Sequence, residues 1–267
     1  MASNGKMPER ASETANKTEK TQKNSKGLFS GMSKTVVLTI IVLACGCVAL
    51  FTAIAVYAHT SSIRASAEEY DHLRILAADS LELESYEFYA SLSALELEMR
   101  QINPEYVGWL RIDGTNIDYP VVRGADNTKY LNTSFYGDEN ITGTIFMDYR
   151  NVGEPLQHII MYGHNLQQGG MFTDLIKFTN RQFRDENNII TLIVNDNEVK
   201  FEIFSARMSD INDPAYDLNL NEPRYFARFA NKIGAPLEAT QILTLSTCTR
   251  GGSDDARVIV QASRIFD

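Results

Sequence analysis

The sequence predicts a mainly β protein with α additions: an eight-stranded β-barrel with N-terminal helices and one helix between strands six and seven. Three observations support this prediction. Eight short runs rich in β-branched and aromatic residues follow Gly108, as in closed or nearly closed barrels. Residues 62–101 are rich in Glu, Leu and Ala, which favours helix. A charge-free apolar run precedes both parts, and the 267 residues contain no internal repeat.

Residues 1–34 form a polar, basic segment with seven Lys or Arg and three Glu, a net charge of +4. The segment has too few large apolar residues to bury a core, so we expect a disordered tail. The whole chain has a net charge of −9, so residues 59–267 hold −13. This acidic balance argues against a nucleic-acid partner, because phosphate binding requires a basic surface.

Residues 35–58 contain 24 residues without a charged side chain. As a helix they would extend roughly 36 Å, which is enough to cross a hydrocarbon core of about 30 Å. The run is too long for the apolar core of a cleaved signal peptide. We therefore predict a retained transmembrane helix, with this segment as the membrane partner of the protein.

The charges that flank this segment predict its orientation. Glu68, Glu69 and Asp71 follow it, whereas the residues before it include Lys17, Lys20, Lys23, Lys26 and Lys34. Positively charged flanks stay in the cytoplasm. We therefore expect a single-pass cell-membrane protein with a cytoplasmic tail and an extracellular part that begins at residue 59.

Residues 59–101 predict one or two amphipathic helices between the membrane and the barrel domain of residues 102–267. Asn103–Pro104 should end them, because the residue before a proline avoids the helical region. The apolar positions recur at spacings of three and four, which indicates a packing face; they are Leu73, Leu76, Ala77, Tyr86, Tyr89 and Leu92.

Two details of the barrel strands carry further expectations. Pro120 lies within a predicted strand, which indicates an edge or a bulge. Asp196–Asn197 lies between two strand-like runs and predicts a hairpin turn. The expected strands are GWLRI, IDYPVV, GTIFMDY, HIIMYG, NIITLIV, EVKFEIFSA, QILTLSTC and ARVIVQAS.

One helix is expected between strands six and seven, in the long connection of the domain. It would cover Asn221–Ile233, with Pro223 in its first turn, a position that tolerates proline because no amide hydrogen is needed there.

The candidate nucleophile is Cys248, the only cysteine after the apolar run; Cys45 and Cys47 lie within that run. A thiol needs a partner that lowers its pKa or accepts its proton. His59 and His72 lie near the membrane, so the candidate partners are His158 and His164. His164 follows a strand in a glycine-containing loop, where scaffolds present functional groups. His158 begins the same strand, which favours a structural role.

A hairpin around residues 249–256 would place Arg257 opposite Cys248 at facing strand ends. A guanidinium there could favour the thiolate and donate hydrogen bonds to an oxyanion. Two alternatives stay open: Arg257 could be a surface charge paired with Asp254 or Asp255, and Arg250 could serve instead. These two aspartates are too few for a calcium cage. No metal or cofactor motif occurs, so we expect no cofactor.

The run Thr244–Cys248, with Arg257 nine positions later and Tyr162–His164 before it, resembles the sortases. These are membrane-anchored cysteine transpeptidases of Gram-positive bacteria. The resemblance covers residues 100–267. The helices before the barrel, the helix between strands six and seven, and the stretches Asp126–Leu131 and GTIFMDYRN are similar to class B sortases in particular. The resemblance thus implies a sortase-type barrel.

The resemblance also implies roles for individual residues. Cys248 would attack the threonine carbonyl of a sorting signal on a secreted protein and form a thioacyl-enzyme. His164 would act as general acid and then as base, and Arg257 would hold the carbonyl. The acyl group would pass to an amine of a cell-wall precursor or of a pilin. The residues implied for signal binding are Asn127, Leu131, Tyr162 and Ser246, and the connection from Ser209 to Ile233 would form a groove wall.

Three other functional classes remain open on the residues alone. A secreted cysteine hydrolase would release free acid even with amines present. A wall-modifying transpeptidase of another fold would have its histidine closer to the cysteine. A non-catalytic adhesin would need no lone thiol. The sequence does not identify the signal motif or decide between wall anchoring and pilus assembly.

Overall fold

The structure is a computed structural model that describes residues 31–81, 86–153, 156–218, 224–249, 251 and 253–266. The chain divides into two compact units at His59–Thr60, and each is described by itself. The predicted disordered tail lies almost wholly outside the described residues and stays a prediction.

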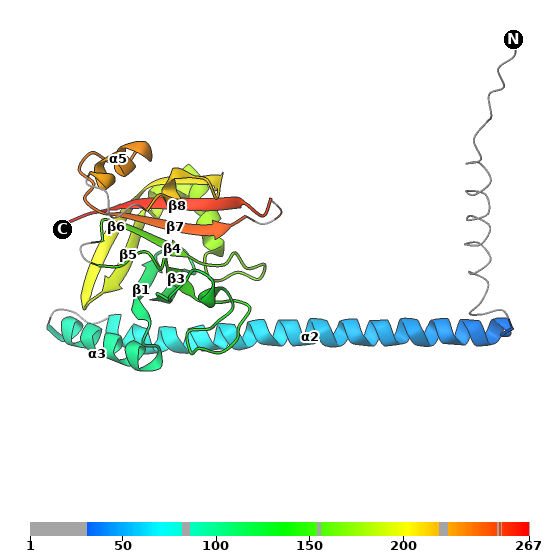
Figure 1. Cartoon of the computed structure of the whole chain (residues 1–267). Coiled ribbons are helices and arrows are strands. Elements are labelled where there is room, and N and C mark those ends of the chain that lie inside the picture. The colour runs from blue at the N-terminus through cyan, green and yellow to red at the C-terminus, as the bar shows by residue number, and fades with distance from the viewer. Residues whose placement is uncertain are drawn as a thin grey trace, which may run out of the picture. The chain divides into compact units, whose positions relative to one another are not determined.

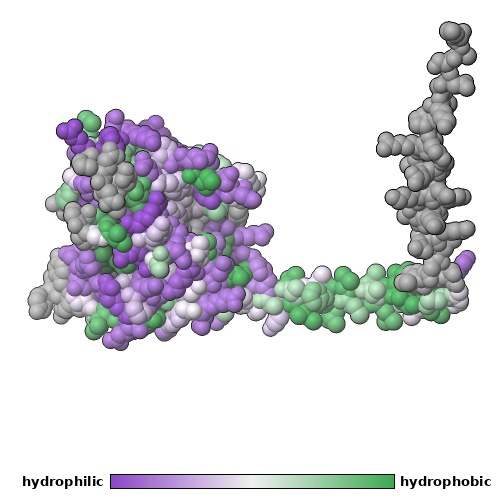
Figure 2. All heavy atoms as spheres, in the orientation of Figure 1, coloured by the Kyte–Doolittle hydropathy of each residue, from purple (hydrophilic) through white to green (hydrophobic). Residues whose placement is uncertain are grey.

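Helix α2 (Lys34–Leu81) begins in the first unit and contains the predicted membrane segment. Within Lys34–Ala78, an 18-residue window reaches a mean hydropathy of 2.7 and has no buried residues. Figure 2 shows hydrophobic residues along the visible face of this part of α2. By length and composition, the helix can cross a membrane. It does not end at residue 58, because no glycine or proline occurs between Gly46 and Pro104 to interrupt it.

In the second unit, the end of α2 and helix α3 (Tyr86–Ile102) bury one face each. The predicted face is confirmed at Leu73, Ala77 and Leu92, which are at most 1% exposed. Leu76 is partly buried against the same core. The side chains of Tyr86 and Tyr89 lie outside the described residues. Helix α3 ends before Asn103, as predicted from the following proline.

The eight predicted strands all form and close into one barrel (Figure 1). The order around the barrel is β1-β2-β3-β4-β7-β8-β6-β5, with parallel pairs at β2–β3 and β4–β7. The strands are β1 (Tyr106–Ile112), β2 (Asp118–Val122), β3 (Ile145–Met147), β4 (His158–Tyr162), β5 (Ile189–Val194), β6 (Asn197–Asp210), β7 (Ile242–Cys248) and β8 (Ala256–Arg264).

Two details of the strand prediction change. The turn between β5 and β6 is Asn195–Asp196, and Asn197 already pairs with Val194. Both turn residues have positive φ, at 49° and 58°, as a two-residue hairpin of the primed type requires. Pro120 lies opposite Trp109 inside the closed barrel and not at an edge. The register shift lies in the opposing β1, between Tyr106 and Gly108.

The helix between β6 and β7 is α5 (Tyr225–Lys232), shorter than predicted. It begins after Arg224, which has a φ of 67°; Pro223 lies outside the described residues. The other short helical elements are η1 (Lys129–Leu131), η2 (Thr173–Thr179), α4 (Arg181–Glu186) and η3 (Pro214–Tyr216).

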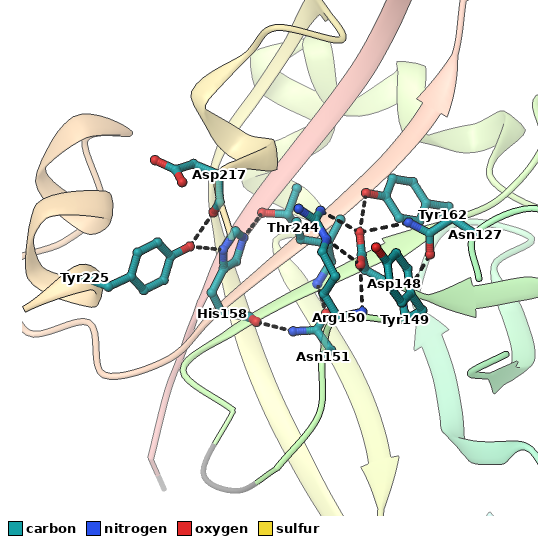
Figure 3. A network of polar contacts seen from close by, with 11 residues as sticks. Asn127, Asp148, Tyr149, Arg150, Asn151, His158, Tyr162, Asp217, Tyr225 and Thr244 are labelled. Atoms are coloured by element: carbon teal, nitrogen blue, oxygen red, sulfur yellow. Dashed lines mark hydrogen bonds and ion pairs between the residues drawn. The ribbon is translucent and has the colours of Figure 1, made fainter. Parts of the chain in front are cut away.

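The fully buried His158 connects α5 to the barrel (Figure 3). Its Nδ1 lies 2.9 Å from Tyr225 Oη, its Nε2 lies 3.1 Å from Thr244 Oγ1, and its ring stacks on Phe229 at 3.9 Å. Because Tyr225 donates to the carbonyl of Asp217, Nδ1 donates to Tyr225 and Nε2 accepts from Thr244. The neutral imidazole therefore satisfies this arrangement, and the structure gives His158 a packing role.

This arrangement predicts an acid-sensitive attachment of α5. Burial lowers the pKa of His158 from 6.5 to about 3. Between about pH 6.5 and 3, His158 binds a proton in the unfolded chain but not in the folded one. The free energy of unfolding therefore falls as the pH falls through this range, by at most about 1.4 kcal/mol per pH unit. Denaturant unfolding of the detergent-solubilised chain at several pH values measures this slope. His158→Gln should reduce the slope, whereas Gln at the exposed His72 should not.

Candidate active site

The side-by-side pairing of β4 and β7 brings His164 close to Cys248. The two strands are parallel, and Tyr162, the last residue of β4, lies opposite Ser246 of β7. Two residues beyond this pair, His164 and Cys248 occupy matching positions. Because side chains alternate between the faces of a sheet, they lie on the same face as Tyr162 and Ser246. Gly163 N donates to Ser246 O at 3.3 Å and extends the ladder past the strand end.

The β7–β8 hairpin brings Arg257 to the same rim. Cys248 pairs directly with Arg257, as predicted. Thr249 N donates to Ala256 O at 3.1 Å and closes the base of the connecting loop. Cys248 is exposed and unpaired with any other cysteine. Cys248 and Arg257 therefore lie on the adjacent strands β7 and β8, and His164 lies two residues beyond the end of β4.

Arg257 binds backbone carbonyls and not carboxylates. Its Nη1 donates to Asp254 O at 2.7 Å and to Ala256 O at 3.0 Å. Within the part of the chain that the structure describes, no ion pair joins it to Asp254 or Asp255, so the surface-charge alternative has no contact to support it. The rival Arg250 lies outside the described residues.

The ring of His164 is held from the other side by η1. Its Nε2 lies 2.7 Å from the carbonyl oxygen of Leu131. A carbonyl only accepts hydrogen bonds, so Nε2 carries the proton and Nδ1 is the nitrogen available for proton exchange.

The 3-10 turn η1 is itself anchored. Asp126 Oδ1 accepts from the backbone amides of Thr128 and Lys129. The buried Tyr130 donates to Glu105 Oε2 at 2.5 Å. The orientation of the imidazole therefore depends on a turn that begins about 35 residues earlier in the chain.

All seven predicted site residues line one cavity of about 490 Å³. The structure brings together the proposed catalytic and signal-binding residues, but their roles stay predictions. The lining consists of Asn127, Leu131, Phe146, Tyr162, Gly163, His164, Ile211, Tyr216, Ser246, Thr247, Cys248 and Arg257.

Sequence reasoning missed Tyr216 and Ile211, which lie on the long connection after β6. Tyr216 Oη lies 2.6 Å from Ser246 Oγ, and its ring stacks on Tyr162 at 6.4 Å with an interplanar angle of 12°. Both residues lie inside the predicted wall. A lone tyrosine in an irregular segment gives no periodic signal, so nothing in the sequence singled it out.

The wall is held in place by Asp213, whose side chain is 6% exposed. Arg207 binds both of its oxygens, at 2.6 and 3.0 Å, and Ala215 N donates to it at the start of η3. Burial would raise the pKa of Asp213, but the hydrogen bonds from Arg207 and Ser209 lower it overall. The carboxylate stays charged and fixes the turn that carries Tyr216.

Comparison with known proteins gives a consistent picture. The family described as Sortase domain matches residues 110–265. Sortase B of Staphylococcus aureus is 29% identical over 178 residues, which are 63% of this chain and 73% of that protein. Sortase B of Listeria monocytogenes is 29% identical over 179 residues, with the same coverage.

Solved structures are similar over a larger part of the chain. An X-ray structure of a mutant form of Clostridium perfringens sortase B is 30% identical, covers 75% of this chain and 98% of its own, and has a TM-score of 0.67. A crystal structure of sortase B complexed with triglycine is 25% identical, covers 76% of this chain and 98% of its own, and has a TM-score of 0.65.

The close packing of Gly143 against η1 generates a prediction. A Cβ atom at Gly143 would overlap Tyr130 O and lie 2.8 Å from Leu131 O, the atom that binds His164. Gly143→Ala should therefore displace that carbonyl and lower the activity at least about tenfold, because small misplacements at a reacting centre are costly. Gly137→Ala is the matched control, since Gly137 also has a positive φ but no atom within 4 Å of its Cβ position. Equal activity of the two folded variants would contradict the prediction.

Proposed function

This chain belongs to the sortase family and is a class B sortase with transpeptidase activity, and on that premise we propose that Cys248 is its nucleophile, His164 its general acid and base, and Arg257 its oxyanion-binding residue. The observation that supports this assignment is the register across β4, β7 and β8. It aligns these three side chains at one rim of the barrel, beside one cavity.

The first half-reaction would acylate Cys248. The thiolate sulfur attacks the carbonyl carbon of the threonine in the sorting signal, and the negative charge develops on the carbonyl oxygen. Arg257 lies opposite Cys248 and would donate hydrogen bonds to that oxygen. The C–N bond then breaks, a protonated His164 gives its proton to the leaving amine, and a thioester remains on Cys248.

The hydrogen bond to Leu131 assigns the two nitrogens of His164 different tasks. Nε2 donates to the Leu131 carbonyl and keeps the ring oriented. Nδ1 would exchange protons with the reacting groups.

The second half-reaction would transfer the acyl group to a primary amine. His164 would now accept a proton from the amine as it attacks the thioester, and the Cys248 thiolate leaves. A solved sortase B is complexed with triglycine, a peptide with a free amino group, which supports an amine acceptor here. Cell-wall precursors and pilins both offer such amines. A hydrolase would use water in this step.

The proposed location follows from α2. The apolar part of the helix would span the cell membrane once, with the lysine-rich flank in the cytoplasm and the barrel outside. The enzyme would then meet secreted proteins that bear a sorting signal.

Mass spectrometry of the full chain in detergent, incubated with sorting-signal peptides, tests the proposed nucleophile. We expect a thioester adduct on Cys248 that a small primary amine converts to the amide product. Cys248→Ala should form no adduct, because no other thiol lies in the barrel domain. An unchanged adduct in this variant would refute the assignment, and free acid as the sole product with the amine present would favour the hydrolase.

Replacement of the arginines tests the oxyanion role. Arg257→Ala should lower the acylation rate by about 100-fold or more. The midpoint of thermal unfolding should change little, because the hydrogen bonds of the Arg257 side chain in the described structure go to the backbone carbonyls of Asp254 and Ala256 beside it. Arg250→Ala is the control. Full activity of the Arg257 variant, with loss of activity in the Arg250 variant, would assign the role to Arg250.

A further inference from the structure

We propose that the buried carboxylate of Asp148 is a positioning residue for the sorting-signal cavity, which sets the hydrogen-bonding polarity of Asn127 and Tyr162. The proposal rests on the proposed function, because it assumes that this cavity binds the signal peptide. Asp148 itself does not line the cavity.

Asp148 follows the last residue of β3 and is fully buried. Its Oδ1 accepts from the backbone amide and the Nε of Arg150, both at 2.9 Å. Its Oδ2 accepts from Arg150 Nη2 at 2.8 Å, from Tyr162 Oη at 2.9 Å and from Asn127 Nδ2 at 3.1 Å (Figure 3). Burial would raise the pKa of Asp148, but the hydrogen bonds from Arg150 and Tyr162 lower it overall, so the group is an anion at neutral pH.

The anion determines which way the Asn127 amide points. Tyr149 N donates to Asn127 Oδ1 at 3.0 Å, and one N–H of Nδ2 donates to Asp148. These two contacts fix the amide orientation from both sides. Among the described residues the second N–H of Nδ2 has no acceptor, and Asn127 lines the cavity. Asn127 therefore offers the signal peptide a donor and not an acceptor.

The same anion fixes the polarity of Tyr162. Its only hydroxyl hydrogen is donated to Asp148, so the oxygen can only accept from a ligand. Burial and the adjacent Asp148 charge raise the pKa of Tyr162, which keeps it a phenol. Its ring packs against Phe146 at 5.4 Å and Tyr216 at 6.4 Å. Asn127 and Tyr162 thus present complementary groups, a donor and an acceptor, to one cavity.

An Asp148–Arg150 ion pair that served only stability would not need the hydrogen bonds from Tyr162 and Asn127. Arg150 and its own amide already satisfy Oδ1, and the further bonds of Oδ2 go to two residues that line the cavity. Asp148→Asn has nearly the same volume but only one acceptor oxygen. If its NH₂ group faces Tyr162 and Asn127, it meets two donors; if it faces Arg150, it meets a cation. Both orientations preserve the packing and remove the negative charge that holds Tyr162 and Asn127 as donors.

The kinetics of Cys248 acylation by a sorting-signal peptide test this role. We expect Asp148→Asn to raise KM and lower kcat/KM by about 10- to 100-fold, the effect of losing one or two charge-assisted hydrogen bonds. The rate at which an amine releases the preformed thioester, and the rate at which iodoacetamide alkylates Cys248, should stay within about twofold, since Asp148 contacts neither Cys248 nor His164. A fall in kcat at unchanged KM would overturn the proposal.

Asp174→Asn is the matched control. Asp174 is 12% exposed in its side chain, pairs with Lys177 at 3.1 Å and accepts from the backbone and side chain of Asn116. Like Asp148, it thus combines a cation with uncharged donors, but none of these residues lines the cavity. This variant should keep the wild-type KM.

A double-mutant cycle separates positioning from packing. In a Tyr162→Phe, Asn127→Ala background, Asp148→Asn should lower kcat/KM by less than about threefold, because its effect acts through the two removed groups. An undiminished loss in that background would show that Asp148 only supports the fold. Absence of the thioester in the wild type and in Asp174→Asn would instead refute the proposed function itself.

Discussion

The parallel pairing of β4 with β7 is the constraint on which the site depends. Each backbone hydrogen bond of this ladder fixes the register, and a slip by one residue would turn His164 to the opposite face from Cys248. The antiparallel β7–β8 pair places Arg257 directly opposite Cys248. Residues from two distant parts of the chain therefore meet because of backbone geometry, before any side-chain contact between them is made.

Buried polar groups orient the side chains that the β4–β7 pairing brings together. The ladder places the side chains, but it does not decide their orientation or the polarity that they present. The Leu131 carbonyl orients His164, Asp213 holds the turn that carries Tyr216, and Asp148 binds two residues of the cavity lining. Each anchor lies outside the cavity or contributes only its backbone. The site is thus defined largely by residues that a substrate would not touch.

Much of the fold could be predicted because its signals are local. The eight strands were identified by composition, and elimination left Cys248 and His164 as partners; resemblance added the four cavity residues. One detail of the barrel was wrong for a physical reason. The β5–β6 turn lies one residue earlier than predicted because both of its residues adopt positive φ. Tyr216 and Asp148 could not be found, since their importance arises from contacts across the barrel.

The segment between β6 and β7 has a separate set of attachments. Asp213 ties its beginning to Arg207 on β6, and the contact of Tyr225 with His158 ties α5 to β4. His158 is itself paired with Ile242 in the β4–β7 ladder, and Tyr216 of the same segment contacts Ser246 of β7. The connection is therefore anchored on the strands that carry Cys248 and lead to His164, so an exchange of this segment between related enzymes would have to keep both anchors.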